Sequence, residues 1–253
     1  MKISVCGKGG SGKTTIVALL AVQAVAKDFT VLVVDSDESN PGLSRMLGFE
    51  NPPHSLMELV GGKAAVKGKM GTGSLFKESH ITMKDIPCEY LQGRGRLFHV
   101  RIGKILQAME GCACPMGVLT REFLKKLRLG EKEIAIIDME AGVEHFGRGL
   151  DETIDRVLIV VEPSFDSLAV AEKIKALASG MNKRASAILN KTPSGAVAEK
   201  MRVALHRNEI EIIGEIPNDL MVFEAGVEGR VCGSGKALDE AGNVLNRLLK
   251  KTD

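Results

Sequence analysis

The stretch GKGGSGKTT at residues 7–15 has the residue types that bind phosphate groups. It fits the pattern G-x-x-x-x-G-K-[ST], in which glycine amides surround phosphate oxygens and a helix N-terminus adds positive charge. We expect Lys13 to reach the β- and γ-phosphates of ATP and the Thr14 hydroxyl to be a ligand of Mg²⁺. The other residues expected to contact the nucleotide here are Gly9, Gly10, Ser11, Gly12 and Thr15.

The same glycines also spell G-x-G-x-x-G, the pattern of a dinucleotide-binding loop. Asp35, which closes the second apolar run, resembles the ribose-binding acid of such a fold. A dinucleotide-binding loop, however, does not require the Lys13-Thr14 pair. In addition, a further apolar run ends at Asp138, which places this aspartate beside the loop. An aspartate in that position commonly holds Mg²⁺ through water. These features favour a nucleoside triphosphate over a dinucleotide.

Cys112 and Cys114 form a second group of residues that could do chemistry. Pro115 suits the first turn of a helix, so the pair would lie at a helix N-terminus, which lowers thiol pKa values. In an extended segment, residues two apart point the same way, so one soft metal ion could contact both thiolates. The spacing alone also fits a strained disulfide or two unrelated thiols.

Two thiolates do not complete a metal site, which commonly needs four ligands. The missing ligands could come from the same chain, where Cys88, His80 and His99 are available. They could also come from the same cysteine pair on a second copy of the chain, because a two-fold axis would give four sulfur ligands. Of the remaining cysteines, Cys6 is expected in the core and Cys232 in a glycine-rich turn.

These candidate residues must be positioned by alternating strands and helices. Apolar runs without polar alternation predict strands buried on both faces, as in a parallel sheet. The predicted strands are 3–6, 31–34, 134–137, 157–161, 185–189 and 210–216, with 97–102 as a weaker one. The predicted helices are 15–26, 116–127, 168–178 and 196–206, and a last helix has an apolar stripe (Leu238, Ala241, Leu245, Leu248) that should pack on the sheet.

This alternation predicts an α/β fold with a doubly wound, mostly parallel sheet of about seven strands and helices on both faces. We expect one P-loop domain over residues 1–253. Residues 50–95 interrupt the alternation with glycines and lysines. We interpret them as a mobile surface insertion rather than a phosphate-binding basic patch.

Composition narrows the class of protein. The 253 residues include 34 Lys+Arg against 32 Asp+Glu, no Trp and one Tyr, which argues against a nucleic-acid binder. No apolar run is long enough to cross a bilayer, so no membrane association is expected. Five cysteines without a signal peptide indicate a reduced, cytoplasmic protein rather than a disulfide framework.

Lys8 adds information that the general phosphate-loop pattern lacks. Together with residues 9–14 it resembles the deviant Walker A motif, KGGxGKT, of the MinD/ParA/nitrogenase-iron-protein group of dimeric ATPases. The resemblance implies that Lys8 reaches the phosphates of the partner in a homodimer, as an arginine finger does. It also implies that Asp37 orients the attacking water, that Asp35 helps to hold Mg²⁺, and that adenine lies against three residues: Asn190, Pro217 and Asp219.

The C-x-C-P motif at 112–115 and the segment 138–149 are similar to the CooC-type nickel-insertion ATPases of carbon monoxide dehydrogenase. This resemblance covers essentially the whole chain. It implies ATP-dependent dimerisation, Ni²⁺ or Zn²⁺ bound by the paired Cys112 and Cys114, and delivery to apo carbon monoxide dehydrogenase. It also implies that 138–142 form switch II, that Gly142 senses the γ-phosphate, and that His145 orients the switch rather than binding nickel.

Two other classes of function stay open on the sequence. One is an iron–sulfur reductase like the nitrogenase iron protein, although that relative takes its cysteines from well-separated positions. The other is a MinD/ParA-like positioning ATPase that works on membrane or DNA, which would need a basic surface or a membrane helix.

Overall fold

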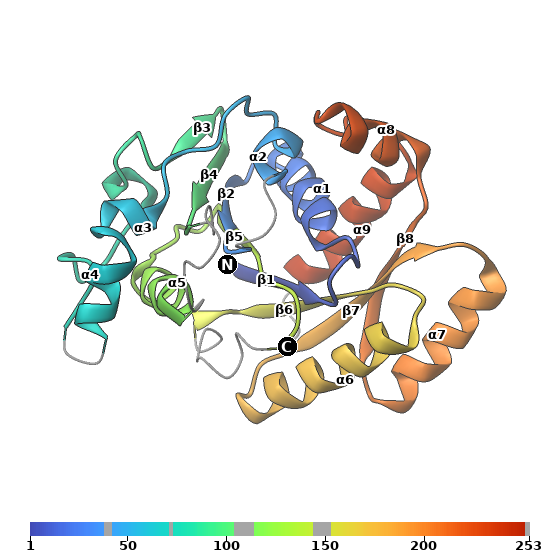
Figure 1. Cartoon of the computed structure of the whole chain (residues 1–253). Coiled ribbons are helices and arrows are strands. Elements are labelled where there is room, and N and C mark those ends of the chain that lie inside the picture. The colour runs from blue at the N-terminus through green and yellow to red at the C-terminus, as the bar shows by residue number, and fades with distance from the viewer. Residues whose placement is uncertain (38–41, 71–72, 104–113, 144–152, 251–253) are drawn as a thin grey trace.

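The computed structural model describes residues 1–37, 42–70, 73–103, 114–143 and 153–250. Within these residues, eight strands form one sheet in the order β3-β4-β2-β5-β1-β6-β7-β8, and every neighbouring pair except β3–β4 is parallel (Figure 1). The strands are β1 Lys2–Gly7, β2 Thr30–Asp35, β3 Gln92–Arg94, β4 Leu97–Arg101, β5 Glu133–Asp138, β6 Arg156–Val161, β7 Ala185–Thr192 and β8 Glu211–Pro217.

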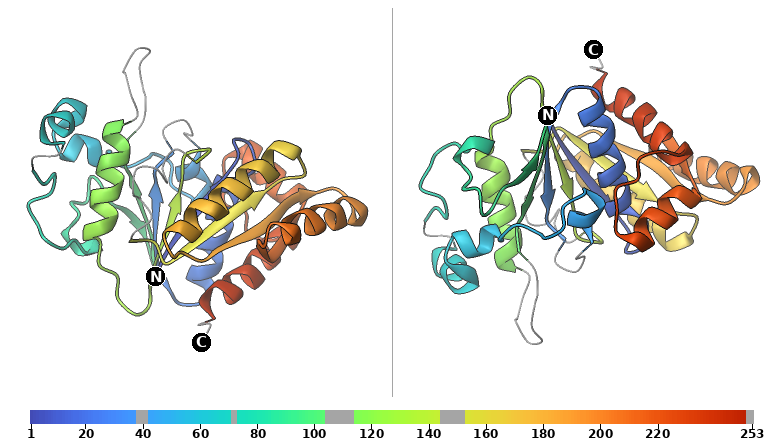
Figure 2. Two further views of the ribbon diagram at one scale, coloured as in Figure 1. Left: turned by 90° about the horizontal axis from the view of Figure 1, so that it is seen from below. Right: turned by 90° about the horizontal axis from the view of Figure 1, so that it is seen from above.

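Helices cover both faces of this sheet (Figure 2). The helices are α1 Lys13–Ala26, α2 Leu43–Met46, α3 Leu56–Leu59, α4 Gly62–Lys69, α5 Cys114–Lys126, α6 Phe165–Gly180, α7 Gly195–Arg207, α8 Leu220–Glu228 and α9 Lys236–Leu249, with a 3₁₀ turn at Met83–Asp85. One buried cluster joins α1 and α9 to the sheet, and a second joins α5, α6 and α7 to its other face. The predicted doubly wound α/β fold is therefore confirmed.

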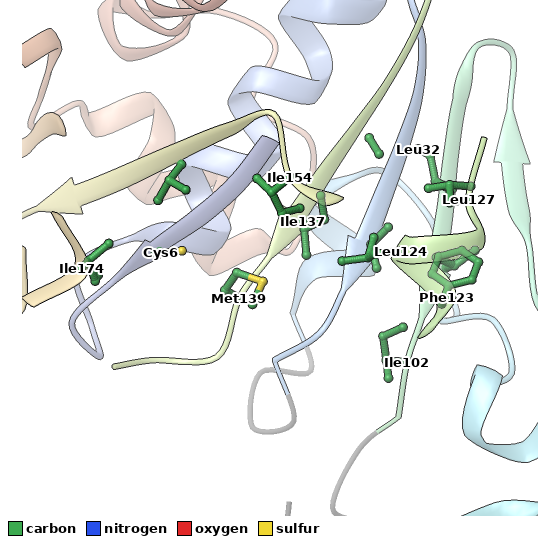
Figure 3. Close-up of a cluster of buried hydrophobic side chains, with 14 of the residues drawn as sticks. Cys6, Leu32, Ile102, Phe123, Leu124, Leu127, Ile137, Met139, Ile154 and Ile174 are labelled. Carbon is green, nitrogen blue, oxygen red and sulfur yellow. The ribbon is translucent and has the colours of Figure 1, made fainter. Parts of the chain in front are cut away.

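The predicted strands form because their side chains are buried on both faces of the sheet. In β1, β2, β5 and β6 almost every residue is buried, which is what runs of Val, Ile and Leu without polar alternation indicate. Figure 3 shows part of the second cluster, where Cys6 of β1 and Ile137 of β5 lie in the same apolar layer as Phe123 of α5. Cys6 is fully buried, as predicted.

The prediction of seven strands missed β3. This strand is short and antiparallel to β4, and Gly93 lets it lie against the ring of Phe98, because a Cβ at residue 93 would collide with that ring. A three-residue strand with only one partly buried residue leaves no apolar pattern in the sequence. The last helix, α9, buries Leu238, Ala241, Leu245 and Leu248, as predicted.

Residues 50–95 hold α3, α4 and β3 and pack against α5. Ser55 and Glu58 form a capping box at the start of α3, which satisfies free amides of that helix. Further along, the backbone amides of Leu75 and Phe76 donate to the Glu122 carboxylate of α5 at 2.8 and 3.3 Å. The segment thus has local structure and a fixed attachment to α5, while its mobility stays a prediction.

No helix within the described ranges is both long and apolar enough to cross a membrane.

Candidate nucleotide-binding site

The phosphate-binding loop lies between the end of β1 and the start of α1, and its glycines allow its shape. Gly12 has φ +96° and immediately precedes the first turn of α1, and a Cβ there would collide with the Asn190 side chain. Gly7 has φ +146°, and a Cβ there would collide with the Val160 carbonyl of β6. Both positions therefore need glycine, and the loop amides gather at a helix N-terminus that attracts phosphate.

Lys13 and Ser11 lie inside this loop. The Lys13 side chain is buried, and its Nζ donates to the backbone carbonyl of Lys8 at 3.4 Å. Ser11 is fully buried, and its Oγ has no hydrogen-bond partner among the described residues. The loop therefore keeps an ammonium and a hydroxyl at its centre, where the phosphates of a nucleotide would lie.

Three aspartates meet at the carboxyl ends of β2 and β5. Asp35 and Asp138 are directly in register on these neighbouring strands, and Asp37 follows two residues after Asp35. All three are buried. The pKa of Asp138 is raised to about 7, chiefly by burial and also by the nearby charges of Asp35 and Asp37, while a hydrogen bond from Thr14 and the charge of Lys13 work against the rise.

The contact between Thr14 and Asp138 fits the expected Mg²⁺ site. Thr14 Oγ1 donates to Asp138 Oδ2 at 2.7 Å, and Asp138 Oδ1 is buried with no partner among the described residues. These two groups, with Asp35 beside them, supply the hard oxygen ligands that Mg²⁺ prefers. A bound Mg²⁺ would neutralise charge on the carboxylates and on the phosphates.

Lys8 is held within its own chain. Its Nζ contacts Glu162 Oε1 at 3.1 Å, and Glu162 Oε2 lies 3.7 Å from Lys191 Nζ. Lys191 also donates to the Gly10 carbonyl at 2.5 Å. No sequence motif identifies Glu162 or Lys191 as residues of this site. Their position is the available signal, since both lie at the carboxyl ends of strands close to the phosphate-binding loop.

Comparison with known proteins gives the same assignment as this geometry. Residues 3–231 match the model of the CobQ/CobB/MinD/ParA nucleotide-binding domain. The chain belongs to this family. It is therefore a P-loop ATPase, in agreement with the motif at residues 7–15.

Two relatives resemble this ATPase over their full lengths. An uncharacterized ATP-binding protein of Methanocaldococcus jannaschii is 37% identical, over 99% of this chain and 100% of the relative. The carbon monoxide dehydrogenase accessory protein CooC of Rhodospirillum rubrum is 30% identical, over 99% of this chain and 97% of CooC. Among solved structures, MinD of Pyrococcus horikoshii with Mg-ADP has a TM-score of 0.74 at 19% identity, covering 98% of this chain and 96% of MinD, which supports the fold.

The residues predicted to contact adenine have bonding roles of their own in this ATPase. Buried Asn190 donates from Nδ2 to the Ser11 carbonyl at 2.7 Å, so it supports the phosphate-binding loop. Asp219 caps α8 by accepting from the Met221 amide, and it also accepts from the Ala237 amide at the start of α9, both at 2.9 Å. Pro217 ends β8 beside Thr192. The adenine contacts themselves stay a prediction.

The segment predicted as switch II runs beside the phosphate-binding loop. The Gly142 amide donates to the Gly7 carbonyl at 3.2 Å, and Gly142 has φ +95°, a conformation that glycine adopts easily. This contact places Gly142 against the phosphate-binding loop, while the role of 138–142 as switch II stays a prediction. His145 lies outside the described residues.

The cysteine pair is described only in part. Helix α5 begins at Cys114, so Pro115 occupies its first turn as predicted, but Cys112 and the Cys114 side chain lie outside the described positions. The described part of the chain contains no group of three or more His, Cys, Asp or Glu that could hold a metal ion. His99 lies fully buried in β4 against Phe49, and Cys88 is exposed.

Proposed function

We propose that this ATPase is a metallochaperone, which binds Ni²⁺ between the C-x-C pairs of two chains and supports nickel insertion into apo carbon monoxide dehydrogenase. The observation that carries the proposal is the position of Cys114, at the start of α5, in a chain that resembles CooC over its full length. Helix α5 runs back from the edge of the sheet where β2 and β5 end (Figure 2). The thiols would therefore belong to the same edge as the nucleotide site.

Helix α5 is a rigid base for such a pair. Leu119, Phe123 and Leu124 are fully buried, so packing fixes its position against the sheet. Ser36, between Asp35 at the end of β2 and Asp37, has its Oγ 3.5 Å from Thr120 Oγ1 of α5. This contact joins the nucleotide site to the helix that carries the thiols.

ATP binding would close the metal site and ATP hydrolysis would reopen it. With Mg·ATP in both chains, Lys8 of each would contact the phosphates of the other, and four thiolates would surround one metal ion. Lys13, and a Mg²⁺ ion that Thr14 would hold, would stabilise the charge that develops when water, oriented by Asp37, attacks the γ-phosphorus. The bond to the ADP oxygen breaks and inorganic phosphate forms. Loss of the γ-phosphate reopens the dimer and releases Ni²⁺ to the client.

Metal stoichiometry tests this proposal directly. We expect one Ni²⁺ or Zn²⁺ per two chains in the wild type, measured by elemental analysis and mass with and without a non-hydrolysable ATP analogue. The Cys112→Ser/Cys114→Ser variant should lose the metal, while Cys88→Ser, which changes an exposed cysteine, should keep it. Metal retained by the double variant would overturn the proposal.

Two further measurements separate the proposal from its alternatives. Iron and sulfide with a visible absorption band, in place of nickel, would indicate an iron–sulfur reductase. Co-sedimentation with liposomes or DNA would indicate a positioning ATPase. For the metallochaperone, transfer of ⁶³Ni from the loaded protein to apo carbon monoxide dehydrogenase should depend on ATP hydrolysis and fail in the double-cysteine variant.

A further inference from the structure

Glu162 lies at a point where two lysines of the nucleotide site meet. It follows directly after β6, the strand beside β1, and its side chain is 19% exposed. Its backbone amide donates to Ser167 Oγ at 3.1 Å, and Ser164 caps α6 by accepting from the Ser167 amide. Short bonds to the first turn of α6 therefore hold the backbone of Glu162 in place.

The carboxylate of Glu162 has a separate contact for each lysine. Oε1 lies 3.1 Å from Lys8 Nζ, and Oε2 lies 3.7 Å from Lys191 Nζ. The Lys8 side chain is 33% exposed, so it has room to rotate toward solvent. If Lys8 leaves, Glu162 keeps its contact with Lys191, and no carboxylate is left without a cation.

This geometry conflicts with the role that the family resemblance gives to Lys8. Lys8 Nζ lies 3.1 Å from Glu162 of its own chain, whereas the trans role places it at a phosphate of a second chain. Lys8 must therefore turn from Glu162 toward the partner to bind in trans, and a dimer weakens two such contacts. In the closed dimer, Lys8 exchanges the Glu162 carboxylate for a phosphate that carries more negative charge. This exchange favours the closed dimer only when nucleotide is bound.

We propose that Glu162 is a positioning residue that holds Lys8 in cis and so sets how readily two ATP-bound chains associate. The inference rests on the proposed dimer, in which Lys8 acts in trans. A partly exposed ion pair such as that of Lys8 and Glu162 changes the equilibrium constant of the state it stabilises only about 1.4- to 5-fold. Two pairs per dimer should therefore weaken association by roughly 2- to 30-fold.

The test is the dimer dissociation constant of Glu162→Gln, measured by sedimentation velocity with a non-hydrolysable ATP analogue and Mg²⁺. Glutamine keeps the shape of the side chain and removes its charge. We expect dimerisation to tighten by roughly 2- to 30-fold relative to wild type. Glu172→Gln, which removes an exposed carboxylate from α6, should leave the constant unchanged. Glu162→Asp, which keeps the charge with a shorter reach, should fall between Gln and wild type.

A second background separates positioning of Lys8 from a merely structural effect. In Lys8→Ala chains, Glu162→Gln should no longer change the dissociation constant, because the side chain it restrains is absent. Tightening that persists without Lys8, or no tightening when Lys8 is present, would overturn the inference. If Lys8→Ala alone dimerises like the wild type, the trans role of Lys8 is wrong, which is a failure of the proposed dimer rather than of the contact.

Discussion

The nucleotide site has a basic side and an acidic side, and the two are stabilised differently. On the basic side, at the ends of β1, β6 and β7, each described cation contacts an oxygen of its own chain: Lys13 the Lys8 carbonyl, Lys8 the Glu162 carboxylate and Lys191 the Gly10 carbonyl. On the acidic side, at the ends of β2 and β5, three buried aspartates lie together and the pKa of Asp138 rises to about 7.

The difference shows what each side needs from its ligand. The cations of the basic side already contact oxygens of their own chain, so phosphate must compete with these contacts. The carboxylates of the acidic side raise one another's energy, so a cation relieves them. Mg·ATP brings both charges at once, which explains how one ligand can reorganise both sides.

Removing the buried cation of the basic side should have the largest effect. Lys13→Ala takes away the ammonium at the centre of the loop, and we expect ATP hydrolysis to fall about 10³-fold, which is about 4 kcal/mol of transition-state stabilisation. Phosphate release under saturating ATP measures it. The exposed Lys27→Ala at the end of α1 is the matched control and should hydrolyse ATP normally. A loss below tenfold would contradict the role of Lys13.

Removing a charge from the acidic side should stabilise the protein. The folded pKa of Asp138 is raised, so the folded state binds its proton more tightly than the unfolded state does. Ionisation of Asp138 therefore lowers the free energy of unfolding. This penalty is absent below the pKa of the unfolded state, about 4, grows as pH rises toward the folded pKa of about 7, and is complete above that pH. Asp138→Asn removes this penalty and leaves an oxygen to accept from Thr14.

We therefore expect nucleotide-free Asp138→Asn to be more stable than wild type at pH 8, on the order of 2–4 kcal/mol, with the gain shrinking toward pH 4.5. Urea unfolding across this pH range, without Mg²⁺, measures the difference. Glu240→Gln, which removes a partly exposed carboxylate from α9, should show no such pH dependence. A gain that is equal at both pH values would show that the charge of Asp138 is not the cause.

The framework of both sides was predictable from sequence, but the side-chain contacts within the basic side were not. Runs such as 134–137 and 157–161 give buried strands because no polar residue interrupts them, and GxxxxGKT fixes the loop that follows β1. Glu162 follows β6 and Lys191 lies near the end of β7, yet their pairing depends on the strand order, which places β6 between β1 and β7. Local patterns do not encode that order. For the same reason the double capping role of Asp219 was missed.

A smaller effect is expected from Asn190, which supports the loop of the basic side. Asn190→Ala removes the 2.7 Å hydrogen bond to the Ser11 carbonyl inside the protein. Leaving a buried carbonyl without its partner costs about 1–3 kcal/mol of unfolding free energy. Urea unfolding measures it, and Asn243→Ala on the exposed surface of α9 should stay within about 0.5 kcal/mol of wild type. Equal stability of the two variants would show that the loop does not depend on Asn190.

The smallest effect concerns the link from the acidic side to α5. Thr120 Oγ1 donates to the Met116 carbonyl at 2.8 Å, which leaves it to accept from Ser36 Oγ at 3.5 Å. Thr120→Val keeps the size of the side chain and removes this acceptor. If this contact couples nucleotide binding to Ni²⁺ binding, its loss should reduce the ratio of Ni²⁺ affinities with and without a non-hydrolysable ATP analogue about 2- to 4-fold. This corresponds to a coupling free energy below about 1 kcal/mol. Competition with a chromogenic chelator measures the ratio.

Ser36→Ala, which removes the donor of the same hydrogen bond, should give the same reduction. The double variant should show no further reduction, because both changes break one contact. Additive losses would mean that each hydroxyl acts through a different neighbour, and the acidic side would then be coupled to the thiols by another route.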